Sequence, residues 1–238
     1  MIPLKRSEWG EKSTVTVSDL PLLKAHYNIP DSCTLHVQSE GEFYDSPKGE
    51  NRWALSVETF RQGFRLPANA FINDLLKAYK VAPSQLTPNA WGTLTVFQVA
   101  WACVGLPSSV PLFKRFHRIF PLRCAWCISV DGIRFLQDPL IKNDTARWLQ
   151  PWFLVENGFA PEVPRQYTTE RIKPKFSYTE AEKEDHQKMI DFFETNRLSF
   201  ACVLSERVLA KAKISSGNAP QESFGKFFLL PLYSRCFE

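Results

Sequence analysis

One uncharged segment constrains the fold of this chain more than any other feature. No charged residue occurs between Lys80 and Lys114, and residues 90–106 within that gap are apolar at almost every position. A helix of this composition is apolar all round, so it must be buried in protein or in lipid. The segment is shorter than the roughly 20 residues that cross a bilayer, and prolines bracket it. A central core helix is therefore favoured over a membrane span, with Asn89 as its cap and Gly105 as its stop.

Shorter amphipathic helices are predicted around this segment. Capping residues and apolar spacing indicate helices at 18–27, 56–61, 69–79, 109–120, 180–194 and 198–213. Lys114, Arg115 and Arg118 then share the polar face of the 109–120 helix. The region 30–51, rich in Ser, Glu, Asp and Gly, is predicted to be an extended surface loop.

Strand signals follow these helices. Residues 126–130 and 133–137 flank Asp131 and Gly132, a dipeptide typical of the two-residue turn of a β-hairpin. Residues 152–155 follow a proline and can supply a third strand. The predicted fold class is mainly α with a small antiparallel β-sheet (α+β), arranged as a single helical domain with an inserted hairpin and a helical C-terminal extension.

Composition divides the chain into five predicted parts. They are an N-terminal extension (1–17), a globular domain (18–160), a linker rich in proline and basic residues (161–178), a helical extension (179–213) and an irregular tail (214–238). We expect the linker to be flexible because proline removes backbone donors and interrupts regular structure.

Short pieces of the chain, collinear over residues 18–160, resemble a known family. The most specific are Gly-Phe-Arg-Leu-Pro at 63–67 and Gln-Leu-Thr-Pro-Asn-Ala-Trp at 85–91. On these motifs the chain resembles the plant gypsy-type transposon domain, a transposase-like domain of retroelement-associated plant reading frames. The resemblance implies retroelement ancestry and assigns no catalytic residue. That family continues into a charged or coiled-coil tail, whereas this chain stops soon after Lys213 in an apolar ending, which indicates a truncated or alternatively ended reading frame.

No set of side chains forms a recognisable catalytic or metal site. Cys124 and Cys127 have metal or redox spacing, but in a strand their thiols point to opposite faces, and no second ligand pair exists. The sequence motifs of phosphate-binding loops, zinc proteases, serine hydrolases and aspartic proteases are missing. His117 is predicted to be a packed side chain, and His26 and His36 to be isolated. We therefore expect no metal, no cofactor and no enzymatic activity.

Two basic clusters are the candidate nucleic-acid-binding residues. The first cluster is Lys114, Arg115, Arg118 and Arg123, and the second is Arg171, Lys173 and Lys175. Lys and Arg number 29 against 25 Asp and Glu, and the resulting net charge of +4 is too small to indicate a dedicated nucleic-acid binder.

Two classes of function stay open. A structural or protein-interaction module with an unknown protein partner is favoured over a weak, non-specific nucleic-acid-binding (gag-like) module, and an enzyme is third. No secretory signal is readable, and six scattered cysteines fit reduced thiols. The sequence thus predicts an intracellular protein, in the nucleus or the cytoplasm, with no membrane partner.

Overall fold

The predicted core helix is the centre of the structure. The computed structural model describes residues 12–122, 125–130, 150–168, 170, 172–196, 198 and 203–215. Helix α5 (Pro88–Val104) is buried at every position from 90 to 101, with Trp91 and Trp101 exposed by 1% and 0%. Among the described residues, no helix is both long and apolar enough to span a membrane.

The two ends of α5 show how local chemistry positions it. The Thr87 side chain accepts a hydrogen bond from the backbone N–H of Ala90 (3.2 Å), so the cap is Thr87 and not Asn89 as predicted. Pro88 explains the difference, because proline favours the first helical position and leaves the residue before it as the cap. Gly105 ends the helix in the left-handed conformation (φ 76°), as predicted.

Shorter helices precede and follow α5. They are α2 (Asp19–His26), α3 (Val57–Arg61), α4 (Ala70–Tyr79), the 3-10 helix η1 (Pro83–Gln85) and α6 (Val110–Phe116). The side chains of Ser56, Asn69 and Ser109 each accept a hydrogen bond from a backbone N–H two or three residues further on. These caps begin α3, α4 and α6 where the sequence predicted them.

A three-stranded antiparallel sheet lies beside these helices. Its spatial order is β1 (Thr34–His36), β5 (Trp152–Glu156) and β2 (Arg52–Ser56). Two predictions are wrong here, because β1 lies within the supposed loop 30–51 and β5 joins this sheet instead of the hairpin. Phe153 and Val155 pack into the main core, while Trp152 and Leu154 pack into a smaller cluster on the other face. A strand that is apolar on both faces belongs at the centre of a sheet.

A two-stranded antiparallel sheet follows α6. Its strands are β3 (His117–Leu122) and β4 (Ala125–Val130). The helix predicted over 109–120 is therefore wrong beyond Phe116. Pro121 supplies the physical reason, because the residue before a proline is disfavoured in a helix, whereas proline is tolerated in an edge strand. Arg118 lies on this strand and not on the polar face of a helix.

The described residues test only part of the hairpin prediction. Residues 126–130 form a strand as predicted, but their partner in the described chain is β3, which precedes them. The segment 133–137 and its turn at Asp131 and Gly132 lie outside the described residues, so the pairing expected there stays a prediction.

The C-terminal part contributes two further helices, α7 (Glu180–Thr195) and α9 (Glu206–Lys211). At the start of α7, Thr179 and Glu182 each accept a hydrogen bond from the other's backbone N–H, which is a capping box. The helix predicted over 198–213 is not continuous, because Leu204 and Ser205 lie in a turn and a bend before α9.

Both of these helices share the core of α5. Met189 and Phe193 of α7 and Val208 and Leu209 of α9 belong to the same buried cluster as the tryptophans of α5. Their burial removes apolar surface of α5 from water. The hydrophobic core therefore contains side chains from both sides of residue 160.

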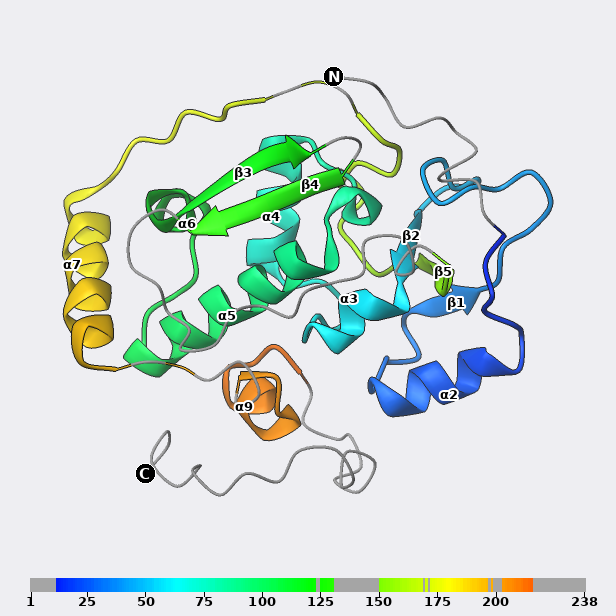
Figure 1. The fold of residues 1–238 in the computed structure, drawn as a ribbon, viewed down its shortest axis with the longest axis horizontal. Coiled ribbons are helices and arrows are strands. Elements are labelled where there is room, and N and C mark those ends of the chain that lie inside the picture. Colours follow the sequence, from blue (N-terminus) through cyan, green and yellow to red (C-terminus); the bar gives the residue numbers. More distant parts are fainter. Residues whose placement is uncertain are drawn as a thin grey trace.

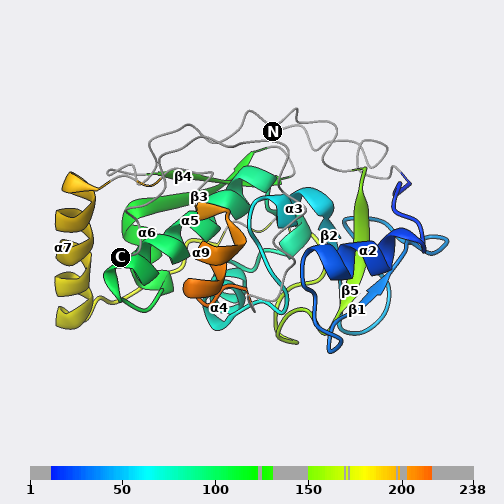
Figure 2. The same ribbon diagram turned by 90° about the horizontal axis from the view of Figure 1, so that it is seen from below.

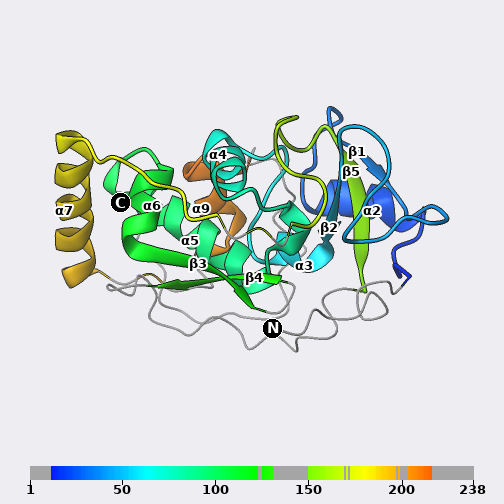
Figure 3. The ribbon, with the colours of Figure 1, turned by 90° about the horizontal axis from the view of Figure 1, so that it is seen from above.

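The arrangement is visible from three sides. Figure 1 shows α5 in the middle, with α7 at one end of the molecule and the three-stranded sheet with α2 at the other. Figures 2 and 3 show α5 between the β3–β4 ribbon and α4. The predicted α+β class is confirmed, with two small antiparallel sheets in the described part of the chain.

Because α5 is buried, we expect truncation of either of its tryptophans to lower the stability of the fold. Trp91→Ala or Trp101→Ala should lower the free energy of unfolding by roughly 3–5 kcal/mol, because each removes a large buried aromatic side chain. Leu22→Ala, at a side chain of α2 that is 68% exposed, should change it by less than about 0.5 kcal/mol. Chemical denaturation of the three variants measures the difference. Wild-type stability of both tryptophan variants would contradict a core role for α5.

Candidate functional site

The first basic cluster meets the predicted linker. The ammonium group of Lys114 donates a hydrogen bond to the main-chain oxygen of Pro174 and lies 5.3 Å from the centre of the Phe176 ring. The guanidinium carbon of Arg115 lies 4.0 Å from the centre of the Tyr178 ring. Both cations of α6 are therefore engaged with aromatic rings of the same molecule, which fastens the linker to the helix.

The second cluster consequently lies next to the first. Lys173 and Lys175 are exposed and flank Pro174, the residue that Lys114 contacts. We name Lys114, Arg115, Lys173 and Lys175 the basic surface. Arg118 is exposed on β3.

Two predicted residues, Arg123 and Arg171, lie outside the described residues. Whether they extend the basic surface stays a prediction.

The linker also contacts the domain before it reaches α6. The indole N–H of Trp53 donates to the main-chain oxygen of Val163 (3.2 Å). The Gln85 amide donates to the main-chain oxygen of Thr168 (2.9 Å) and accepts from its N–H (3.2 Å). Gln85 thus pairs with the linker backbone as a neighbouring strand would.

Arg65, in the Gly-Phe-Arg-Leu-Pro motif, also holds a later part of the chain against the domain. Its Nη1 donates to the main-chain oxygens of Phe60 (3.0 Å) and Phe64 (2.9 Å), and its Nη2 donates to the carboxylate of Glu206 (2.8 Å). The ion pair attaches α9 to the end of α3. Sequence reasoning missed this role, although an arginine between Phe64 and Leu66 already signals a cation held among apolar side chains.

Gly63 permits the close packing beside Arg65. Its φ is 89°, a conformation that favours glycine. A Cβ atom there would lie 2.6 Å from Cγ2 of Thr95 and 2.8 Å from Cδ2 of Leu204. The motif therefore brings α5 and the turn before α9 into direct contact.

His117 is a packed side chain, as predicted. Its ring stacks on Phe113 with the centroids 4.4 Å apart and meets the Phe97 ring edge-on at 5.7 Å. Burial lowers the pKa of His117 to about 3. The ring is thus neutral near pH 7 and buried among aromatic rings, with its Nδ1 3.3 Å from the main-chain oxygen of Phe113. This environment fits packing and does not fit a base in contact with substrate.

The other histidines have partners. The prediction that His36 is isolated is wrong, because its Nε2 lies 3.0 Å from the carboxylate of Glu156. His26 packs edge-on against Tyr27 with the ring centres 4.7 Å apart, so it is not isolated either. Burial, followed by the charge of Arg65, lowers the pKa of His26.

Cys127 is half-buried on β4, and burial raises the pKa of its thiol. A raised pKa leaves less of the thiolate that attacks substrates or binds metals. Cys124 lies outside the described residues, so the predicted divergence of the two thiols stays a prediction. Among the side chains that the structure describes, no three His, Cys, Asp or Glu residues gather as a metal-binding group.

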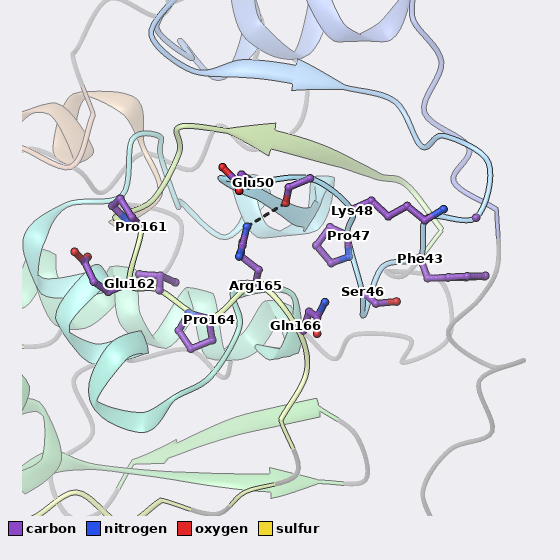
Figure 4. Close-up of a pocket in the computed structure, with 13 residues that line it drawn as sticks. Phe43, Ser46, Pro47, Lys48, Glu50, Pro161, Glu162, Pro164, Arg165 and Gln166 are labelled. Carbon is purple, nitrogen blue, oxygen red and sulfur yellow. Dashed lines mark hydrogen bonds between the residues drawn. The ribbon is translucent and has the colours of Figure 1, made fainter.

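An open groove of about 970 Å³ lies between residues 41–50 and 161–166. Figure 4 shows Pro161 and Pro164 on one side and Pro47 on the other, with Arg165 reaching across to the main-chain oxygen of Gly49 (3.1 Å). Its charged side chains have both signs, and its lining contains no histidine or cysteine. We name it the proline-lined groove.

The geometry from β2 to β3 defines a small α+β unit built round one apolar helix and carrying both motifs. Residues 54–121, which span this unit, match the family model described as "Putative gypsy type transposon". The match confirms the resemblance to gypsy-type transposon domains over residues 54–121 and relates this segment to such elements, while a plant source stays a prediction. Searches of curated proteins and of solved structures find no significant match.

Burial of His117 predicts a loss of stability in acid. Its pKa falls from 6.5 to about 3 on folding, so the unfolded chain binds a proton between these values that the folded chain does not. The contribution of His117 to the free energy of unfolding is fully present above pH 6.5 and is lost as the pH falls towards 3. The expected loss from pH 7 to pH 5 is about 2 kcal/mol.

His117→Phe should remove most of this pH dependence because the phenyl ring can stack on Phe113 without titrating. Denaturation midpoints of the variant and the wild type at pH 7 and pH 5 measure it. His186→Phe is the control. It should remove less of the pH dependence of stability, since His186 is only partly buried. Equal pH dependence of wild type and His117→Phe would contradict the prediction.

Proposed function

We propose that this chain is a non-catalytic, retroelement-derived module that binds other proteins inside the cell, in the nucleus or the cytoplasm. The observation that carries the proposal is how the buried polar side chains of the two motifs are used. Gln85 binds the backbone of Thr168, and Arg65 binds the carboxylate of Glu206. Backbone pairing and docking of a helix are the contacts by which proteins recognise extended peptides and helices.

The titratable side chains also support a non-catalytic role. Catalytic acids and bases need a pKa near the working pH and access to substrate. The pKa of His117 is about 3 and its side chain is buried, while His36 is paired with Glu156. These histidines stabilise the fold in the positions they occupy.

The proline-lined groove is the surface on which we expect a partner protein to lie. It is open to solvent, and Phe43 is a half-buried aromatic side chain in its lining. Lys48 and Glu50 add charges of both signs at its rim, which can fix the orientation of a partner segment.

Photo-crosslinking in cells tests the proposal. A photo-reactive amino acid at position 43 reports on the proline-lined groove, the same group at position 175 reports on the basic surface, and position 22 on α2 is the control. We expect position 43 to yield adducts that protease removes and nuclease does not. Nuclease-sensitive adducts from position 175, with none from position 43 above the control, would reject the interaction module.

Weak, non-specific nucleic-acid binding is the second candidate. The contact between Lys114 and the linker favours it, because it places Lys173 and Lys175 beside the basic residues of α6. Phosphate contacts of this kind are independent of sequence. The rings of Phe176 and Tyr178 already face cations of α6, so they are poorly placed to stack on bases.

Salt dependence measures how much of such binding exists. The slope of the logarithm of the binding constant against the logarithm of the salt concentration reports the number of neutralised phosphates. Because each phosphate contributes about 0.9 to this slope on duplex DNA, the basic surface should give a slope of only a few units. Lys173→Ala with Lys175→Ala should lower that slope by about 2. Lys183→Ala with Lys188→Ala, on α7, is the charge-matched control. Sequence-specific binding that persists at high salt would contradict the prediction.

A further inference from the structure

The surface round Arg65, in the Gly-Phe-Arg-Leu-Pro motif, is covered by the chain's own C-terminal part. We name it the Arg65 groove; Arg65, Trp91, Thr95 and Gln98 line the small cavity left in it, and Gly63 lies beside Thr95. The segment 203–215, which contains α9, lies beside α5 (Figures 1 and 2). This cover is outside the segment 54–121 that matches the transposon family.

The cover is recognised through one charge and several apolar side chains. Val208 and Leu209 are buried, Leu204 lies against the position of Gly63, and Ile214 lines the far end of the groove. Glu206, in the first turn of α9, receives the hydrogen bond from Nη2 of Arg65.

Arg65 is held ready for a carboxylate. Its side chain is 7% exposed, and two main-chain oxygens of the α3 turn hold Nη1 independently of α9. The guanidinium also lies 5.4 Å from the centre of the Tyr27 ring. If segment 203–215 leaves, the buried cation loses its counter-ion, which is unfavourable. The groove therefore selects an occupant that carries a carboxylate.

The chain's own segment fits this groove imperfectly. Among the described residues of the groove lining, Arg65 Nε and Trp91 Nε1 are buried without a hydrogen-bond partner. A cavity of about 10 Å³ remains between Arg65, Trp91 and Ile214. Unpaired buried polar atoms weaken a contact. Since α9 has only six residues, it also has little helical stability of its own.

We propose that the Arg65 groove is a helix-recognition site, occupied in this structure by segment 203–215 and opened when an acidic amphipathic helix of a partner protein replaces it. The inference rests on the proposed role as an interaction module and names the class of partner. By the pattern of Leu204, Glu206, Val208 and Leu209, the partner segment carries an apolar residue in the turn before the helix, a carboxylate in the first turn, and apolar residues two and three positions after that carboxylate.

A fluorescent peptide of residues 203–215 is the probe, and its anisotropy is measured with the full chain. Glu206→Gln in the chain weakens the internal cover, so this variant should bind the peptide at least tenfold more tightly than the wild type does. Arg207→Gln, at an exposed neighbour on α9, is the matched control and should bind like the wild type. A peptide with glutamine in place of Glu206 should lose most of the affinity for the Glu206→Gln chain.

The result that overturns the proposal is a folded Glu206→Gln chain, by circular dichroism, that binds neither peptide or both equally. If that chain fails to fold, Leu204→Ala loosens the same cover and must show the same gain in affinity. The full chain could instead form dimers whose amount rises with concentration and falls in the Glu206→Gln variant. That result would show that the groove binds a second copy of this chain, and it would reject a different partner protein. These readouts use a defined peptide, so they are separate from the crosslinking that decides the proposed function.

Discussion

The structure depends on covering one helix that has no polar side. Because α5 lacks charged residues and is buried from 90 to 101, the elements beside it pack against it and exclude water from its surface. β4, α3, α7 and α9 all pack against it. Aromatic rings fill the remaining space, as where Phe97 stacks on Trp101 with the ring centres 4.0 Å apart. The hydrophobic effect thus organises distant parts of the chain round one element.

The few polar side chains of α5 show how complete this burial is. The hydroxyls of Thr93 and Thr95 donate to main-chain oxygens one turn earlier, and the Gln98 amide does the same. These three side chains donate within the helix itself, so these hydrogen bonds need no water or partner. This arrangement lets a helix with polar residues sit in an apolar core.

The same constraint links the matched segment to the rest of the chain. The motifs at 63–67 and 85–91 end and begin helices, and their polar side chains then hold the linker and α9 against the core. The segment related to gypsy-type transposons is therefore closed by parts of the chain that lie outside it. A surface that recognises its own chain through a buried cation and a side-chain amide has the chemistry needed to recognise another chain.

Local chemistry let the sequence alone determine α5, the caps at Ser56, Asn69 and Ser109, and the packing of His117. Helical period and capping depend on residues within one or two turns, which a sequence displays directly. The same reasoning gave the basic residues of the candidate surface but placed Arg118 on a helix that ends before it. Pro121, only three residues further on, was the local signal against that helix.

Only the tertiary structure decided which distant segments meet. β5 pairs with β1 and β2 instead of a neighbouring hairpin, because an apolar strand needs partners on both edges and cover on both faces. Arg65 and Glu206 meet across 141 residues, and Lys114 meets Pro174 across 60. No periodicity encodes such contacts, since they follow from how the whole chain closes round α5.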